Sequence, residues 1–158
     1  MPKATNIDME TACDIEQLPP NTVMISINEE HEPLYPLKLD RASEDVLTLK
    51  FTDVTARREW MGKQVHPMLI EDAYAILAFI KKHEGKDFLV HCHAGVSRSS
   101  AVCLYLHIEH SYDLKTNFWA TSNPNKHVLG SLFFAKYEKS PLSLNATKDP
   151  TTVFGQAD

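Results

Sequence analysis

Residues 88–108 read FLVHCHAGVSRSSAVCLYLHI and contain three kinds of segment in succession. The first, Phe88-Leu89-Val90, is a short apolar run typical of a buried strand. A loop of small and polar residues around Gly95 follows, and residues 101–108 are then apolar on almost every side. A helix without a polar face is typical of a central, buried position. The stretch therefore predicts a strand, a tight loop, and a buried helix whose amino terminus begins at that loop.

The segments upstream continue this alternation. Apolar runs at residues 22–27 and 46–51 are typical of strands. Within residues 66–85 apolar residues recur every three or four positions, which predicts a helix. Strands that alternate with helices predict an α/β fold with a central, mainly parallel sheet flanked by helices. In such folds ligands bind beyond the carboxyl ends of the strands, where the loop after residue 91 is expected to lie.

The remaining segments set the expected domain boundaries. Two more helices are expected at residues 115–121 and 126–137, separated by the breaker Ser-Asn-Pro-Asn at 122–125, which is expected to be structural. A chain of 158 residues with 43% hydrophobic residues has material for one core. The expected organisation is a polar segment at 1–20, one domain at 21–140 and a polar, loosely attached tail at 141–158.

Charge and cysteine content narrow the class of protein. The 16 Lys and Arg against 21 Asp and Glu leave a formal net charge of −5, which argues against a surface built for nucleic acid or an anionic membrane. Three cysteines without a CxxC pair suggest neither a disulfide framework nor a zinc site. No signal peptide or long apolar run is evident. We expect a cytoplasmic protein without membrane or nucleic-acid partners, whose oligomeric state the sequence leaves open.

Residues 92–99 have the chemistry of an anion-binding loop. The backbone N–H groups of a tight loop and of the following helix terminus can converge on one tetrahedral anion, and Gly95 lets the backbone approach it closely. The guanidinium of Arg98 can donate to two phosphoryl oxygens at once. The same positive surroundings favour the thiolate of Cys92, which could attack phosphorus and form a cysteinyl-phosphate without a metal.

The nine residues 91–99, HCHAGVSRS, resemble the HCxxGxxR(S/T) signature of the cysteine-dependent protein tyrosine phosphatases, and CxAGxSRS is most similar to the dual-specificity branch. The resemblance implies a protein tyrosine phosphatase-like fold with Cys92 as nucleophile. It implies that Ser99 supports the departing thiolate and that His91 braces the loop. The residues then expected to bind the substrate phosphate are His93, Ala94, Gly95, Val96, Ser97 and Arg98.

The resemblance also implies where the general acid lies. In the low-molecular-weight tyrosine phosphatases the signature is near the amino terminus and the acid is downstream, whereas Cys92 lies well past the midpoint of this chain, so the acid is expected upstream. Asp53 is the best candidate, since it follows a predicted strand directly and should emerge at the same sheet edge as Cys92. The alternative is that Asp53 only caps a turn. Asp72, inside the first predicted helix, is the reserve candidate.

Several other residues have two readings. Arg57, Arg58 and Lys63 could recruit acidic or phosphorylated substrates or could simply be solvated. Trp60 could line the pocket or anchor its loop. Cys103 is expected in the core, with a second option of pairing with an oxidised Cys92.

The function that these features favour is a metal-independent protein phosphatase for phosphotyrosine and also phosphoserine or phosphothreonine, with a phosphoprotein as substrate and no cofactor. No histidine spacing suggests a metal site. One alternative keeps the chemistry but takes a phosphoinositide or an RNA 5′-phosphate as substrate. Another is a phosphate-binding module without catalysis.

Overall fold

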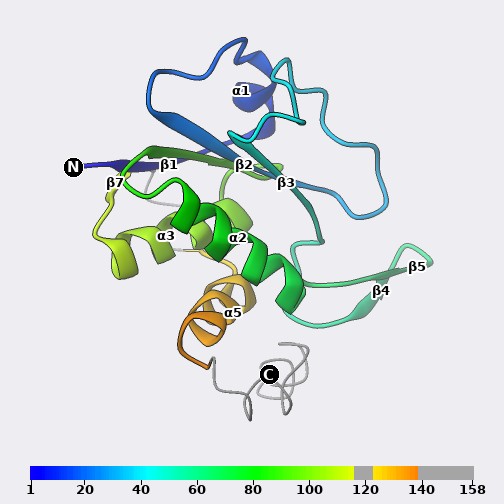
Figure 1. Cartoon of the computed structure of the whole chain (residues 1–158). Helices are drawn as coiled ribbons and strands as arrows, with labels where there is room; N and C mark the ends of the chain where they lie inside the picture. Colours follow the sequence, from blue (N-terminus) through cyan, green and yellow to red (C-terminus); the bar gives the residue numbers. More distant parts are fainter. Residues whose placement is uncertain (116–122, 139–158) are drawn as a thin grey trace.

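A computed structural model describes residues 1–115 and 123–138 of the chain. Its centre is a sheet of five parallel strands in the order β3-β2-β6-β1-β7 (Figure 1). The strands are β1 (Lys3–Ile7), β2 (Thr22–Asn28), β3 (Val46–Lys50), β6 (Asp87–His91) and β7 (Asp113–Lys115). The predicted α/β fold with a mainly parallel sheet is confirmed.

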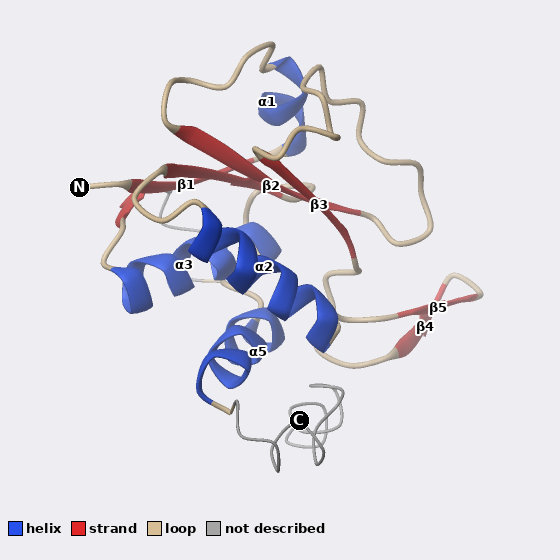
Figure 2. Ribbon diagram, viewed as in Figure 1, coloured by secondary structure: helices blue, strands red, loops and turns tan. Residues whose placement is uncertain are grey.

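Helices cover both faces of this sheet. In Figure 2 α2 (Ile70–Lys82), α3 (Arg98–His110) and α5 (Lys126–Tyr137) lie on one side, and α1 (Met9–Asp14) lies on the other. Every residue of β2 is buried, as expected for an inner strand covered on both faces.

The helices follow the sequence pattern closely. In α2 one apolar face that includes Ala73, Ile76 and Ile80 is buried, and Gly85, with φ 86°, follows the end of the helix. The first six residues of α3, Arg98 to Cys103, are all buried, which confirms the prediction of a central helix behind the loop. The expected burial does not extend to residue 108, because Ile108 is 55% exposed. The last described helix, α5, has the predicted bounds.

The amino-terminal segment requires a correction. Residues 1–20 were expected to precede the folded domain, but β1 lies inside the sheet between β6 and β7, and α1 follows it. Residues 3–7 have no continuous apolar run that would signal a strand. Their stabilisation comes from backbone pairing with two neighbours and from close packing of the fully buried Ala4. Residues 3–14, which form β1 and α1, are therefore part of the folded domain.

Two other regions differ from expectation or lie outside the description. Residues 52–65, for which the hydrophobic pattern predicted no strand, contain a hairpin of β4 (Arg58–Trp60) and β5 (Lys63–Val65). Its turn, Met61-Gly62, has φ of 50° and 78°, as hairpin turns with two left-handed residues require. Lys115 ends β7 and does not begin a helix. The rest of the helix expected at 115–121 and the tail at 141–158 lie outside the described residues.

No helix in the described parts of the chain combines the length and apolar character that crossing a bilayer would require.

Candidate active site

The loop of residues 92–97, called here the cysteine loop, joins the carboxyl end of β6 to the amino terminus of α3. Because β2, β3 and β6 are parallel neighbours, the residues that follow each of them emerge at one edge of the sheet. Those residues are Glu29 after β2, Phe51 and Asp53 after β3, and Cys92 after β6. Topology thus gathers groups that are up to 63 residues apart in the sequence, the separation of Glu29 and Cys92 (92 − 29).

Cys92 lies buried at the start of the loop with 2% of its surface exposed. Its Sγ is 3.2 Å from the Oγ of Ser99, in the first turn of α3. This hydroxyl can donate a hydrogen bond to a sulfur anion, which makes the thiolate a better leaving group. The contact is the one that the resemblance implied for Ser99.

Arg98 is held from two sides. Its Nη1 donates to the carbonyl oxygen of Phe51 at 2.7 Å, and its Nη2 donates to Oε1 of Glu29 at 2.5 Å. Burial alone would lower the pKa of Arg98, but the hydrogen bond and charge of Glu29, with smaller contributions from Cys92 and Asp53, raise it. The guanidinium therefore stays charged although it is 3% exposed.

The third nitrogen of the Arg98 guanidinium, Nε, has no bond of this kind among the described residues. This atom is also buried. A buried donor without a partner costs about 1–3 kcal/mol, a cost that an anion in the loop could remove.

Gly95 brings the cysteine loop against the amino-terminal segment. Its φ is 71°, and a Cβ at this position would lie 2.7 Å from the carbonyl carbon of Ile7 and 2.9 Å from the backbone N of Asp8. Asn6 Nδ2 donates to the carbonyl oxygen of Gly95, and the N–H of Met9 donates to that of His93 at 3.0 Å. The junction of β1 and α1 thus packs directly against the cysteine loop and supports it.

His91 occupies a buried hydrogen-bond network behind Cys92. Burial lowers the pKa of His91, with Arg41 and Arg98 adding to the effect, so the ring is neutral near pH 7. Its Nδ1 is 3.0 Å from the carbonyl oxygen of Cys92, which can only accept, so Nδ1 carries the proton. Its Nε2 then accepts from Ser26 Oγ at 2.6 Å. Ser26 Oγ in turn accepts from Arg41 Nη1 at 3.0 Å, which leaves every polar atom of this network with a partner.

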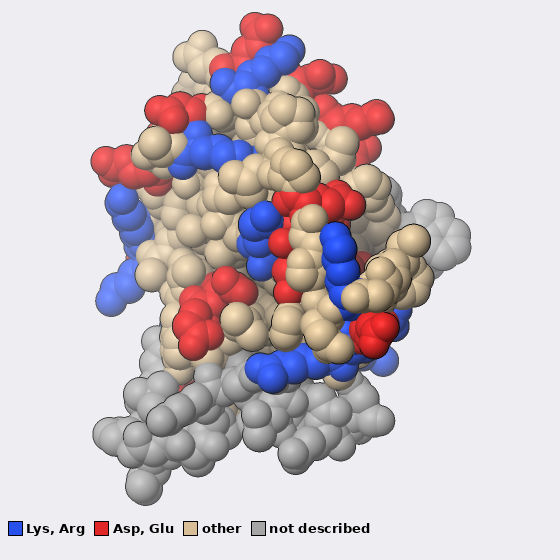
Figure 3. Space-filling model, turned by 90° about the vertical axis from the view of Figure 1, so that its right-hand side faces the viewer, with Lys and Arg blue, Asp and Glu red and all other residues tan. Residues whose placement is uncertain are grey.

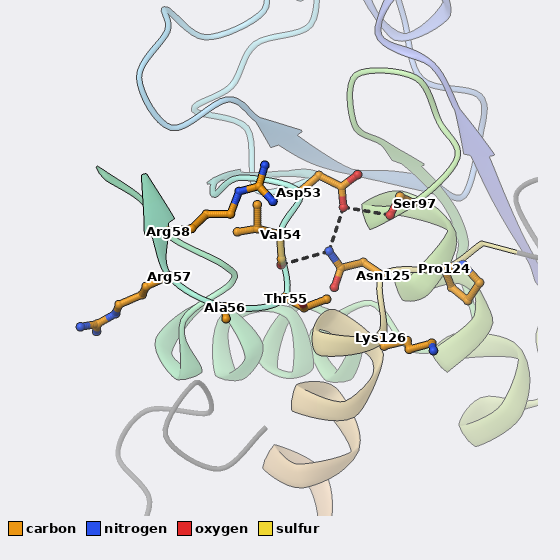
Figure 4. A pocket seen from close by; sticks show the side chains of 10 residues that line it. All are labelled: Asp53, Val54, Thr55, Ala56, Arg57, Arg58, Ser97, Pro124, Asn125 and Lys126. Atoms are coloured by element: carbon orange, nitrogen blue, oxygen red, sulfur yellow. Dashed lines mark hydrogen bonds between the residues drawn. The ribbon is translucent and has the colours of Figure 1, made fainter. Parts of the chain in front are cut away.

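Asp53 contacts the cysteine loop directly. Its Oδ1 accepts a hydrogen bond from Ser97 Oγ at 2.8 Å and another from Asn125 Nδ2 at 2.8 Å (Figure 4). The preceding residue, Thr52, is fixed by its own bond from Oγ1 to Glu30 Oε2 at 2.9 Å.

Asp72, the reserve candidate, has a different position. Its Oδ2 accepts from the backbone N–H of Leu69 at 3.1 Å, at the start of α2. Burial raises its pKa. The structure therefore brings Asp53 to the loop, whereas Asp72 caps a helix.

The remaining candidate residues on the surface line two different cavities. A cavity of about 470 Å³ beside Asp53 is lined by Arg57, Arg58 and Lys126, although in Figure 4 the side chains of Arg57 and Lys126 extend away from Asp53. Trp60 and Lys63 line a second cavity of about 420 Å³. Cys103 is a free thiol, fully buried in the core, and burial raises its pKa.

The face of the molecule drawn in Figure 3 is neither mainly acidic nor mainly basic. On the face shown in Figure 3, acidic and basic side chains are mixed. Any anionic substrate would therefore be held by the loop and its immediate neighbours rather than by a broad basic surface.

Three supporting residues were not singled out from the sequence. Glu29 follows β2 and Asn6 lies in β1, and both strands end at the same sheet edge as β6. Because the carboxyl ends of parallel strands meet at one edge, Glu29 could have been found from the sequence. Asn6 depended on a strand that the sequence did not signal. Asn125 was recognised only as part of a breaker.

Neither a model of a protein family nor a curated protein matches this chain. Within residues 1–115 and 123–138, no three His, Cys, Asp or Glu side chains form a group that could hold a metal ion.

Proposed function

We propose that this chain is a protein phosphatase of the tyrosine and dual-specificity type, with a protein tyrosine phosphatase-like fold. It hydrolyses phosphotyrosine and phosphoserine or phosphothreonine through a cysteinyl-phosphate and without a metal ion. The signature in residues 91–99, the parallel sheet and the surroundings of Cys92 support this assignment.

In the first step the Cys92 thiolate attacks phosphorus in line with the ester oxygen. The S–P bond forms as the O–P bond breaks, and Asp53 transfers its proton to the departing oxygen. Arg98 and the loop N–H groups stabilise the charge on the three remaining oxygens.

In the second step water attacks the cysteinyl-phosphate. Asp53, now a carboxylate, takes a proton from that water, the S–P bond breaks, and phosphate is released. Ser99, 3.2 Å from the sulfur, stabilises the thiolate as it leaves. One carboxyl group thus serves both steps and ends in its starting protonation state.

The observation that carries the proposal is the 2.8 Å hydrogen bond between Ser97 Oγ and Asp53 Oδ1. It joins the loop of the nucleophile to a carboxylate 44 residues away in the sequence. A structural cysteine at a helix terminus would need neither this carboxylate nor the buried arginine beside it.

The test is hydrolysis of an aryl phosphate by the purified chain. Cys92→Ser should abolish turnover, and Cys13→Ser, a substitution of a half-buried thiol elsewhere, should not. Wild-type protein quenched in acid during turnover should carry one phosphate on Cys92. Turnover that survives Cys92→Ser would refute the mechanism, and wild-type protein that binds phosphate but never turns over would identify a binding module.

A substrate panel separates the protein phosphatase from the other phosphatase readings. Phosphotyrosine and phosphoserine peptides, a phosphoinositide and a 5′-phosphorylated RNA should be compared at equal concentration. We expect the phosphotyrosine peptide to give the highest kcat/KM; a higher value for the lipid or the RNA would reassign the substrate.

A further inference from the structure

Asn125 lies where three segments of the chain meet. It is the N-cap of α5 and is 6% exposed. Its Oδ1 accepts from the backbone N–H of Val128 at 3.0 Å, and its own backbone N–H donates to the carbonyl oxygen of Ser97 at 3.0 Å. Its Nδ2 donates to Asp53 Oδ1 at 2.8 Å and to the carbonyl oxygen of Val54 at 3.3 Å.

These contacts use both ends of the side-chain amide. The oxygen satisfies a donor at the start of α5, and the nitrogen reaches the segment that carries Asp53 (Figure 4). Aspartate and serine cap helices about as well as asparagine does. Aspartate cannot donate in its ionised form, and serine is too short to cap the helix and reach Asp53 at once. Capping alone therefore does not account for the choice of asparagine.

The same contacts distinguish the two carboxyl oxygens of Asp53. Oδ1 accepts from two donors, Ser97 Oγ and Asn125 Nδ2. A carboxyl oxygen that accepts two hydrogen bonds is a poor place for the acid proton, so the proton is favoured on Oδ2. Asp53 is in this way anchored by one oxygen while the other can donate.

We propose that Asn125 is a positioning residue for the general acid. It fixes Asp53 above the cysteine loop through Oδ1 and directs the proton of Oδ2 toward the leaving oxygen of the substrate. This inference rests on the proposed phosphatase function, in which Asp53 protonates that oxygen.

The experiment compares Asn125→Asp and Asn125→Ser with wild type and with Asp53→Asn. Asn125→Ser keeps an N-cap acceptor and adds no charge, so its thermal midpoint should stay close to that of wild type. Asn125→Asp also keeps the acceptor but brings a second carboxylate against Asp53 Oδ1, so its thermal midpoint should be lower. Turnover is measured with two substrates: 4-nitrophenyl phosphate, whose leaving group needs little protonation, and phenyl phosphate, whose leaving group needs it more.

We expect kcat for phenyl phosphate to fall about ten- to a hundredfold in both variants, as for a misplaced catalytic group. The loss with 4-nitrophenyl phosphate should be much smaller, and KM should change little. Adding Asn125→Ser to Asp53→Asn should cause no further loss, because the positioned group is then already absent.

Equal losses for the two substrates would overturn the inference, and so would losses that multiply with those of Asp53→Asn. Wild-type kcat in both position-125 variants would overturn it as well. Failure of the proposed function is distinguishable, because wild-type protein would then show no turnover that depends on Cys92.

Discussion

The cysteine loop and residues 52–65, called here the Asp53 segment, are built in opposite ways. Cys92 at the start of the cysteine loop and Arg98 directly after the loop are 2% and 3% exposed, and hydrogen bonds from Asn6 and Met9 hold the loop against the amino-terminal segment. In the Asp53 segment most of the hairpin is exposed, with Trp60 at 57% and Met61 at 87%. Hydrogen bonds from Ser97 and Asn125 connect Asp53 to the rest of the site.

In the proposed mechanism this difference suits two different chemical tasks. A nucleophile and an anion-binding loop work best when their geometry is preorganised, since no reorganisation is then needed during reaction. An acid that must close over substrate and release product works best on a segment that can open. Substitutions in the two regions should therefore have different signatures.

The largest effect is expected from Arg98→Lys. One ammonium cannot reproduce the bonds to Phe51 and Glu29 and still donate to an anion, so kcat/KM should fall about 10³-fold or more for every phosphate ester. Steady-state kinetics with 4-nitrophenyl and phenyl phosphate would measure this. Inhibition by inorganic phosphate should weaken in parallel; intact inhibition would show that Arg98 does not bind the anion.

Asp53→Asn should reduce kcat about 10²–10⁴-fold, with the greater loss for the poorer leaving group, because the donated proton is absent. Inhibition by inorganic phosphate should persist, unlike in Arg98→Lys. Asp72→Asn is the matched control, since asparagine can still accept from Leu69 and activity should remain. A reversal of the two results would assign the acid to Asp72.

The effect of Gly95→Ala on the free energy of unfolding tests how tightly the cysteine loop is packed. The new Cβ would face backbone atoms of Ile7 and Asp8 at less than 3.0 Å, whereas Gly85→Ala has a similar positive φ with nothing within 4 Å. Both variants incur about 1–3 kcal/mol of backbone strain, and Gly95→Ala should lose about 1–3 kcal/mol more from overpacking. Urea denaturation would measure the difference; equal losses would mean that the contact with β1 is unimportant.

Because of His91, the free energy of unfolding should decrease in mild acid. The folded pKa of His91 is lowered, so above about pH 7 both states are neutral and the group contributes nothing. As the pH falls below about 6.5, the unfolded chain binds a proton that folded His91 does not. Stability should then decrease by at most about 1.4 kcal/mol per pH unit until the folded pKa is reached.

The measurement is urea denaturation between pH 7 and 5.5 in a His110→Gln background, because burial also lowers the pKa of His110. His91→Gln in that background should have a flatter profile. Glu30 affects the pH dependence of stability only at lower pH. Burial raises the pKa of Glu30, but hydrogen bonds from His66 and Thr52 together lower it by more, so the stabilisation by Glu30 is lost below about pH 4.5. Identical slopes with and without His91 would contradict the prediction.

Features formed by residues adjacent in the sequence were predicted more completely than features that depend on distant residues. The cysteine loop and α3 were recognised because hydrophobic pattern, small residues and a helix start are adjacent in sequence. Asp53 was selected because it follows a strand whose carboxyl end had to share an edge with β6. β1 was missed because its stabilisation comes from neighbours 80 to 110 residues away, at pairs such as Ala4 with Phe88 and Lys3 with Asp113.

The sequence alone determined the local chemistry: a thiol, a glycine, a guanidinium and two hydroxyls at spacings that place them around one strand–loop–helix junction. These spacings are dictated by short-range backbone geometry, which a linear pattern expresses directly. The tertiary structure alone decided that Glu29 holds Arg98, that Asn6 supports Gly95 and that Asn125 contacts Asp53. Each of these contacts joins residues more than 60 positions apart, and only the packing of sheet and helices brings such residues within hydrogen-bond distance.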